Sequence, residues 1–388
     1  MQVENGGLKQ LPDGNLWSEA GMSLLQEDQV IRGTWKVERF LGEGAFAEVY
    51  RVKHRFLGRQ AMKVFKLIGM TMEEVEQMLE EAVMLSQMGH PNIIRVFDAN
   101  IADTSRGMCG FFTMEYVAGG SLDQFWRSHG VQFVRVNTAV EIIRQVCRGI
   151  AVAHSGTPPL IHRDIKPQNI LVGYDGVGMR VRISDFGLAK HVNPMTLMAS
   201  ARGTPEFKAP EVFADSQCDS CAGDVWAIGT TLYLLLTDRL PYVELGEPDL
   251  DQTIFERPII PPSRLNLNVD PTLDQITMRA LAIEPEKRHP SAKEFLADIE
   301  KWKPRPQASA VLNKADTSSD KTKSALGPHS SVHFEEARKM ADKAVKLARD
   351  FGKLTEAADI MEEACNKWPA LREQYEYTLK LWRRGLLM

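Results

Sequence analysis

One stretch decides the fold of this chain: Ile161-His162-Arg163-Asp164-Ile165-Lys166-Pro167-Gln168-Asn169-Ile170-Leu171. A carboxylate, an ammonium and a carboxamide stand close together in it at Asp164, Lys166 and Asn169, and apolar residues close it on both sides. Dense polar groups between apolar anchors predict a loop that is held rigidly for chemistry. Phosphoryl transfer to a hydroxyl needs a carboxylate at the hydroxyl proton, a cation that faces the phosphoryl group and an amide oxygen that helps to hold Mg²⁺.

The same residues match the pattern H-R-D-x-x-x-x-N, and Asp185-Phe186-Gly187 follows them after a predicted strand over 181–184. In this order the motifs resemble those of the eukaryotic-type (Hanks-type) serine/threonine protein kinases, over roughly residues 33–303. The resemblance implies an α+β class with the bilobal protein-kinase fold, which has an antiparallel β N-lobe with one helix and a mainly helical C-lobe. It also implies that Asp164 and Lys166 are catalytic and that Asn169 and Asp185 hold Mg²⁺ (or Mn²⁺), with ATP as the co-substrate.

A glycine-rich segment, Gly42-Glu43-Gly44-Ala45-Phe46-Ala47-Glu48-Val49, resembles the loop that covers the ATP phosphates in this family, with Ala47 at the place of the third glycine. Glycines let the backbone approach phosphate oxygens that a Cβ would block. Because Ala47 is the smallest replacement, nucleotide binding should survive with a stiffer loop. By the resemblance, the residues of the ATP pocket are Leu41, Gly42, Gly44, Ala47, Val49, Ala61, Lys63, Met114, Glu115, Val117 and Leu171.

A short predicted strand carries Ala61 and Lys63 on one face, because side chains alternate along a strand. In the family this lysine is catalytic: it reaches the α and β phosphates and pairs with a glutamate of the following helix. That helix is predicted over 72–88, where apolar residues recur at helical spacing. We identify the partner of Lys63 as Glu81 and keep Glu80 as the alternative, since neighbouring helix residues point about 100° apart.

The segment that ends in A-P-E at Glu211 resembles a kinase activation segment. Thr204 together with Lys166 is the serine/threonine-kinase arrangement, and Thr204 would belong to the platform that receives a protein substrate. A phosphate on this segment would pair with Arg163 and order the segment. The candidate autophosphorylation sites are Thr196 and Ser200.

Three further matches are structural by the resemblance. Asp224 would cap backbone amides of the catalytic loop, and Arg288 would pair with Glu211 beneath the activation segment. Breaking a buried pair on one side costs roughly 3–5 kcal/mol, so the Glu211–Arg288 pair is expected to matter for stability.

The chain divides into four predicted parts: an arm without periodic pattern over 1–30, the kinase domain over 31–303, a flexible linker over 304–332 and a small all-α module over 333–388. The module resembles a tetratricopeptide repeat around Gly352 to Pro369, and a generic helical hairpin stays open as the alternative. One such unit cannot bury a full core alone. The module is therefore expected to pack on the kinase, to bind a protein partner or to self-associate.

The composition predicts a globular protein without a strong charge field. Of its 388 residues 44% are hydrophobic and 25% charged, and the net charge of −4 argues against nucleic acid or an anionic membrane as a partner. The five irregularly spaced cysteines predict a reducing, cytoplasmic location, with Cys218 and Cys221 as incidental thiols rather than a zinc or redox site. The N-terminus lacks an apolar run, so no secretory signal is expected, and no run is long enough to span a bilayer.

These patterns favour a serine/threonine protein kinase that transfers the γ-phosphoryl group of ATP to protein hydroxyls. Activation-loop autophosphorylation is expected to regulate it, and the C-terminal helices are expected to serve docking or regulation. A scaffold or pseudokinase that acts through its C-terminal helices is disfavoured, because no residue required for the chemistry is missing. A small-molecule kinase is disfavoured by the segment 203–211, which resembles a platform for protein substrates.

Overall fold

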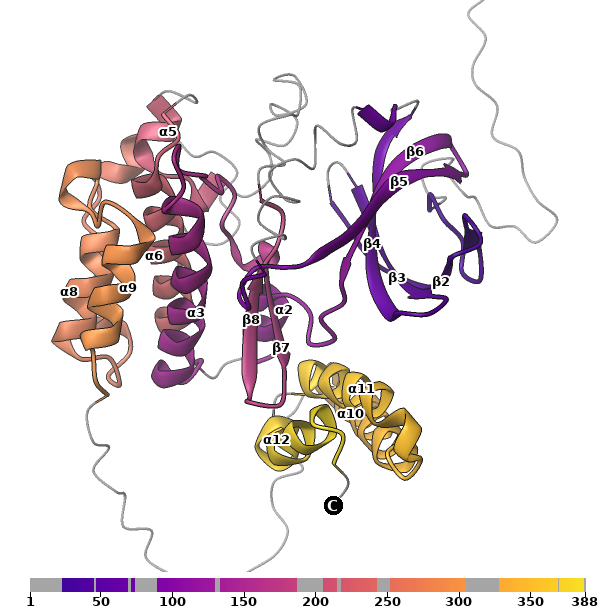
Figure 1. Ribbon diagram of the computed structural model, residues 1–388. Helices are drawn as coiled ribbons and strands as arrows, with labels where there is room; N and C mark the ends of the chain where they lie inside the picture. The colour runs from indigo at the N-terminus through magenta and orange to yellow at the C-terminus, as the bar shows by residue number, and fades with distance from the viewer. Residues whose placement is uncertain are drawn as a thin grey trace, which may run out of the picture. The chain divides into compact units, whose positions relative to one another are not determined.

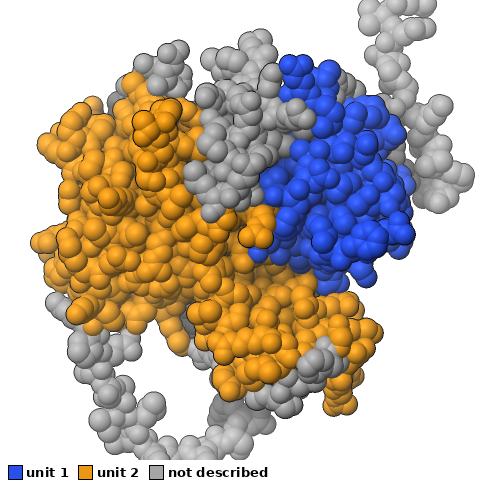
Figure 2. All heavy atoms as spheres, viewed as in Figure 1, with its two compact units in different colours: residues 1–77, 96–116 blue, residues 78–95, 117–388 orange. Residues whose placement is uncertain are grey.

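The computed structural model describes residues 23–44, 47–68, 71–73, 89–129, 133–186, 205–214, 218–242, 252–304, 328–368 and 370–386. The chain forms two compact units, which are coloured separately in Figure 2. Unit 1 comprises residues 1–77 and 96–116, and unit 2 comprises residues 78–95 and 117–388.

Unit 1 contains one six-stranded antiparallel sheet (Figure 1). Its strands are β1 (Val30–Ile31), β2 (Trp35–Glu43), β3 (Ala47–His54), β4 (Gly58–Ile68), β5 (Val96–Thr104) and β6 (Gly107–Glu115), in the spatial order β1-β2-β3-β4-β6-β5. One face carries a buried core that includes Tyr50, Met62, Val64 and Phe111. Because side chains alternate along each strand, the residues between them point to the opposite face.

Residues 23–30, predicted as part of an extended arm, belong to the core of unit 1. Leu24 and Leu25 are buried, and their amides donate to Glu48 Oε2 at 2.9 Å and to the Tyr50 hydroxyl at 3.0 Å. Two adjacent leucines give no periodic signal, yet their burial orders the chain around them. Residues 1–22 lie outside the described residues.

The segment before β5 lies in unit 2, because β5 begins only at Val96 and continues to Thr104. Ile93 instead forms an isolated parallel bridge with Ile183 in unit 2. Asn92 holds this segment there, since its Nδ2 donates to the carbonyl oxygen of Val181 at 2.8 Å and to Gln145 at 3.0 Å.

Unit 2 is mainly helical and holds one two-stranded hairpin. Its first helices are α2 (Leu122–Arg127), α3 (Val136–His154), α5 (Pro210–Ala214), α6 (Cys221–Thr237), α7 (Pro262–Leu265), α8 (Pro271–Ala280) and α9 (Ala292–Lys301), and the hairpin is β7 (Ile170–Tyr174) with β8 (Met179–Ile183). Short 3₁₀ turns lie at Pro167–Asn169, Pro205–Phe207, Gln252–Glu256, Pro285–Lys287 and Phe351–Lys353.

The long apolar run before Thr237 is a core helix. Helix α6 is buried along nearly its whole length, and it shares the main hydrophobic cluster of unit 2 with α3. Ser220 caps it by accepting a hydrogen bond from the amide of Gly223. Among the described helices, none has the length and hydropathy of a membrane span.

Three helices end the chain: α10 (Pro328–Leu347), α11 (Leu354–Lys367) and α12 (Ala370–Arg383). Helix α10 begins inside the segment predicted as a linker, because proline is tolerated in a first turn, where its missing N–H is not needed. Its buried face consists of Ala337, Ala341 and Ala344, and such small side chains let α11 approach closely. Helix α12 contacts β7, beside which Figure 1 shows it.

Candidate active site

Three side chains of the loop between α3 and β7 contact one another. Lys166 Nζ lies 2.9 Å from Asp164 Oδ2, and Asn169 Nδ2 donates to the same oxygen at 2.9 Å and to the Asp164 carbonyl oxygen at 2.8 Å. Since Asp164 occupies the amide nitrogen of Asn169, the amide oxygen faces away from Asp164 and is suited to a cation. The loop thus presents a carboxylate, an ammonium and an amide oxygen in one fixed arrangement.

Asp224, at the start of α6, holds the backbone of this loop. Its carboxylate accepts the amides of His162 at 2.8 Å and Arg163 at 3.0 Å, and the His154 ring lies 3.0 Å from it. Burial alone would raise the pKa of Asp224, but the hydrogen bonds from His154 and His162 lower it below its usual value. The carboxylate is therefore ionised and fixes the loop through charge-assisted hydrogen bonds.

The β7–β8 hairpin brings the two predicted metal ligands to one end. Its strands pair Ile170 with Ile183, and both the amide and the hydroxyl of Ser184 donate to the carbonyl oxygen of Asn169, at 2.9 and 3.1 Å. Asp185 follows directly, so the amide and the carboxylate both stand at the open end of the hairpin, one before β7 and one after β8. Both offer the hard oxygen ligands that Mg²⁺ prefers, and the residues present fit such an ion.

Two residues at this site have left-handed backbone conformations, which are rare for side chains with a Cβ. Arg163 has φ of 68° and Asp185 has φ of 64°. Each such conformation costs on the order of 1–3 kcal/mol and persists only where the surroundings enforce it. Around Asp185 this support includes Phe186, whose ring lies 4.4 Å from that of His162 between centroids, and His162 Nε2, which lies 3.0 Å from the carbonyl oxygen of Ser184.

A pocket beside the loop collects charged side chains. Arg163, Lys208 and Asp219 line it, and Arg163 Nε donates to Asp219 Oδ2 at 2.8 Å. Lys208 Nζ donates to the carbonyl oxygen of Arg163 at 2.7 Å. Two cations and one carboxylate thus line this pocket, next to the residues that end the A-P-E segment.

The predicted pair of Glu211 and Arg288 is present as a bidentate ion pair. The two guanidinium nitrogens Nη1 and Nη2 donate to the two carboxylate oxygens, each at 2.7 Å. Arg288 is only 2% exposed, and it also donates to the carbonyl oxygens of Ala282, Ala222 and Ile283. The pair ties the A-P-E segment to the chain before α9.

In unit 1, four of the residues predicted to bind ATP share the face of the sheet opposite the core. Val49 pairs with Lys63 across β3 and β4, and Ala61 pairs with Met114 across β4 and β6. Directly opposed residues of antiparallel strands point to the same side, so these four side chains form one surface. Among the described atoms none lies within 4 Å of where a Cβ of Gly42 would stand, so packing against them does not demand glycine there.

The predicted residues distribute over the chain as follows. Unit 1 holds Leu41, Gly42, Gly44, Ala47, Val49, Ala61, Lys63, Met114 and Glu115, and unit 2 holds Val117, Asp164, Lys166, Asn169, Leu171, Asp185, Glu211, Asp224 and Arg288. Glu81, Thr196, Ser200 and Thr204 lie outside the described residues. Three residues of the site were not predicted: His154, Lys208 and Asp219. Only Lys208 carried a sequence signal, because it stands inside the A-P-E segment.

A family model of the protein kinase domain matches residues 35–304, which is more than half of the chain. The chain belongs to the protein kinase family. This kinase is 30% identical over 302 residues to the serine/threonine-protein kinase PknB of Mycolicibacterium smegmatis, a match that covers 75% of the chain and 47% of that protein. It is 32% identical over 304 residues to the serine/threonine-protein kinase Pkn1 of Myxococcus xanthus, which covers 74% of the chain and 42% of that protein.

Solved structures show the same protein-kinase fold. The kinase domain of Mycobacterium tuberculosis PknI is 26% identical with a TM-score of 0.53, and the match covers 71% of this kinase and 98% of that chain. A structure of Rad53 in complex with AMP-PNP is 26% identical with a TM-score of 0.52, covering 68% and 64% of the two chains. This kinase spans less than half the length of the two curated relatives it matches, PknB and Pkn1.

Proposed function

We propose that this protein is a serine/threonine protein kinase that transfers the γ-phosphoryl group of ATP to hydroxyl groups of protein substrates. The observation that carries the proposal is the contact of Asp164 with both Lys166 and Asn169 on a loop held by Asp224. The curated relatives named as serine/threonine-protein kinases support the same activity. The AMP-PNP bound to Rad53 supports ATP as the nucleotide.

Each residue of the loop has a role that follows from its contacts. Asp164 orients the attacking hydroxyl and accepts its proton, and Lys166 holds that carboxylate while its charge faces the phosphoryl group. Asn169 keeps its amide oxygen turned outward through its two hydrogen bonds to Asp164. A Mg²⁺ or Mn²⁺ ion held by Asn169 and Asp185 would neutralise charge on the phosphates.

A transfer assay with Mg–ATP and a generic basic protein tests the activity. Asp164→Asn and Asp185→Ala should each lower the rate by about 100-fold or more, because each removes one part of the reaction machinery. Asp28→Asn is a matched control, since Asp28 is exposed and its ion pair is with an exposed lysine on the surface. Equal thermal unfolding midpoints would show that the variants are folded.

Three outcomes would contradict the proposal. Normal activity of Asp185→Ala would refute its assignment as a metal ligand. Phosphorylation of a small molecule but of no protein would favour the second candidate, a small-molecule kinase. Binding of a protein through the C-terminal helices without any turnover of ATP would favour a scaffold.

We further propose that autophosphorylation of the activation segment regulates the kinase. The cationic pocket of Arg163 and Lys208 supports it, because a phosphate could displace Asp219 from Arg163 there. The double variant Thr196→Ala/Ser200→Ala should then lose the increase in rate that preincubation with ATP produces. An unchanged rate before and after preincubation, in wild type and variant alike, would exclude this switch.

The partners and the location of the protein also remain proposals. Protein substrates follow from the proposed activity, and residues 333–388 would dock a protein partner, self-associate or regulate the kinase. The tetratricopeptide-like character of α10 and α11 is supported only by residue spacing around Gly352. Five free cysteines support a reducing, cytoplasmic location.

A further inference from the structure

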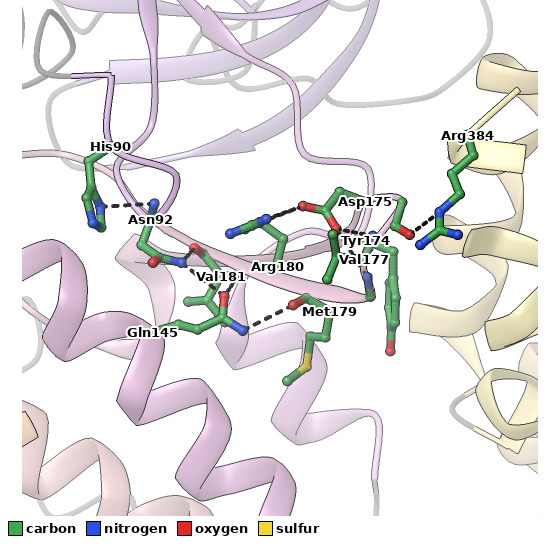
Figure 3. Close-up of polar contacts among 12 residues, drawn as sticks. His90, Asn92, Gln145, Tyr174, Asp175, Val177, Met179, Arg180, Val181 and Arg384 are labelled. Atoms are coloured by element: carbon green, nitrogen blue, oxygen red, sulfur yellow. Dashed lines mark hydrogen bonds and ion pairs between the residues drawn. The ribbon is translucent and has the colours of Figure 1, made fainter. Parts of the chain in front are cut away.

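The β7–β8 hairpin has only two strands, and isolated two-stranded hairpins are marginally stable. One edge is tied to α3 and to the segment before β5. Gln145 accepts the amide of Val181 at 2.9 Å and donates to the carbonyl oxygen of Met179 at 3.1 Å, and Asn92 donates to Val181 (Figure 3). The other edge, along β7, requires partners of its own.

A carboxylate of the C-terminal helices occupies that second edge. The amide of Val172 donates to the carbonyl oxygen of Gly120 at 2.9 Å, and the amide of Tyr174 donates to Glu362 Oε1, on α11, at 3.2 Å. Glu362 is 2% exposed, and Arg383 of α12 donates to the same oxygen at 2.8 and 3.1 Å. Burying a carboxylate costs free energy unless the carboxylate is paired. The contacts of Glu362 therefore favour the arrangement in which α11 lies against β7.

Apolar and stacking contacts extend the interface on both sides of Glu362. The side chain of Tyr174 packs against the hydrophobic cluster of α10, α11 and α12, and burial raises its pKa to about 12. Arg372 of α12 lies over the ring of Phe125 on α2, 4.0 Å from its centroid. A kinase strand and a kinase helix thus complete the packing of a module that could not bury its core alone.

The turn of the hairpin is held by the residue that follows α12. Arg384 Nε donates to the carbonyl oxygen of Gly176 at 2.6 Å, and Figure 3 shows Arg384 pointing toward the turn between Asp175 and Val177. A Cβ on Gly176 would stand 2.8 Å from the side chain of Arg384, and one on Gly178, with φ of 144°, would meet Lys380 at 3.2 Å. The two glycines allow the basic side chains to approach the turn.

These contacts lie on the hairpin that carries the two predicted metal ligands at its open end. Asn169 directly precedes β7, and Asp185 follows β8 after Ser184. We propose that the C-terminal helices grip the hairpin in cis, and that Glu362 and Arg384 are positioning residues that hold Asn169 and Asp185 in place for a metal-bound nucleotide. This inference rests on the proposed function, because it assigns those two residues to the nucleotide's metal ion.

Paired variants of the whole 388-residue chain test whether the C-terminal helices hold the hairpin. Glu362→Leu removes the acceptor for the amide of Tyr174, while Arg383 keeps its ion pair with Asp359 at 2.8 Å. Glu362→Gln retains an oxygen acceptor. Arg384→Met removes the donor to the turn, and Arg384→Lys retains a donor. Glu335→Leu and Arg338→Met, on exposed positions of α10, are the matched controls.

The first measurement is hydrogen exchange of the amides of residues 170–183 in protein free of metal and nucleotide. Glu362→Leu should speed it by about tenfold and Arg384→Met by about threefold, because each removes one hydrogen-bonding partner. The conservative variants and the two controls should resemble wild type. Unchanged exchange in both disruptive variants would show that the C-terminal helices do not hold the hairpin. If circular dichroism shows that Glu362→Leu unfolds the module, Arg384→Met alone provides the test.

The second measurement is the affinity for Mg–ADP by calorimetry, together with KM for ATP and kcat. The disruptive variants should weaken Mg–ADP binding and raise KM by about three- to tenfold with a smaller change in kcat. Faster exchange with unchanged affinity would overturn the link to Asn169 and Asp185. Wild-type protein that binds Mg–ADP but phosphorylates no protein would refute the proposed function and leave this inference intact, whereas absence of Mg–ADP binding in wild type would overturn both.

Discussion

At the scale of single residues, His154 shows how one buried contact sets a protonation state. Burial alone would lower the pKa of His154, but hydrogen bonds to Asp224 and Cys221 outweigh it and raise the pKa to about 9. Protonation of the ring removes the lone pair of Nδ1, which accepts a hydrogen bond from the amide of Ala292 at 3.2 Å. We expect the charged contact with Asp224 to prevail, since charge-assisted bonds are roughly twice as strong as neutral ones.

This assignment predicts a specific pH dependence of stability. A histidine whose pKa is raised on folding stabilises the folded state fully below its unfolded pKa of 6.5, and the effect is lost as the pH rises through about 9. The free energy of unfolding of wild type should therefore exceed that of His154→Gln most at pH 6, and the gap should shrink by pH 9.5. Urea titrations of both proteins across this range provide the measurement, and parallel curves would show that His154 is neutral in the folded protein.

At the scale of elements, the Glu211–Arg288 pair joins α5 to the 3₁₀ turn before α9. Arg288→Met should cost roughly 3–5 kcal/mol of unfolding free energy, because it leaves the Glu211 carboxylate and three carbonyl oxygens without their donor. The double variant Glu211→Gln/Arg288→Met should cost less than Arg288→Met alone. Urea unfolding measures both, and Arg279→Met, which breaks a surface pair with Asp298, should cost about 1 kcal/mol or less.

Sequence reasoning was strongest where chemistry requires fixed residue types at short spacing. The contacts of Asp164, Lys166 and Asn169 lie within one loop, where the sequence already places a carboxylate, an ammonium and a carboxamide close together. The ion pair of Arg163 with Asp219 joins residues far apart in the chain, and no local pattern links them. The buried face of α10 is formed by alanines, which give a weak apolar signal in the sequence, although small side chains are what let α10 and α11 pack closely.

At the scale of the whole molecule, the kinase fold was predictable because its motifs occur in a fixed order along the chain. The docking of the C-terminal helices was not, because it depends on two ionisable side chains on helices, the buried Glu362 and the half-buried Arg372. A charged residue in a helix is usually solvated, and only the packed partners, the amide of Tyr174 and the ring of Phe125, identify these two as interface residues. The spacing of apolar residues left open whether the module meets the kinase or another protein.

If the module holds the hairpin, nucleotide binding must in turn hold the module, since coupling between two binding equilibria is reciprocal. Mg–ADP should therefore slow hydrogen exchange in α11 and α12 by the same factor, about three- to tenfold, by which loss of the grip weakens Mg–ADP binding. The amides of α8, which packs on α6, α7 and α9 and not on the hairpin, serve as the internal control. In Glu362→Leu the protection of α11 and α12 should vanish while saturating Mg–ADP still binds. Equal protection in wild type and variant would mean that the nucleotide acts on these helices by a route other than β7.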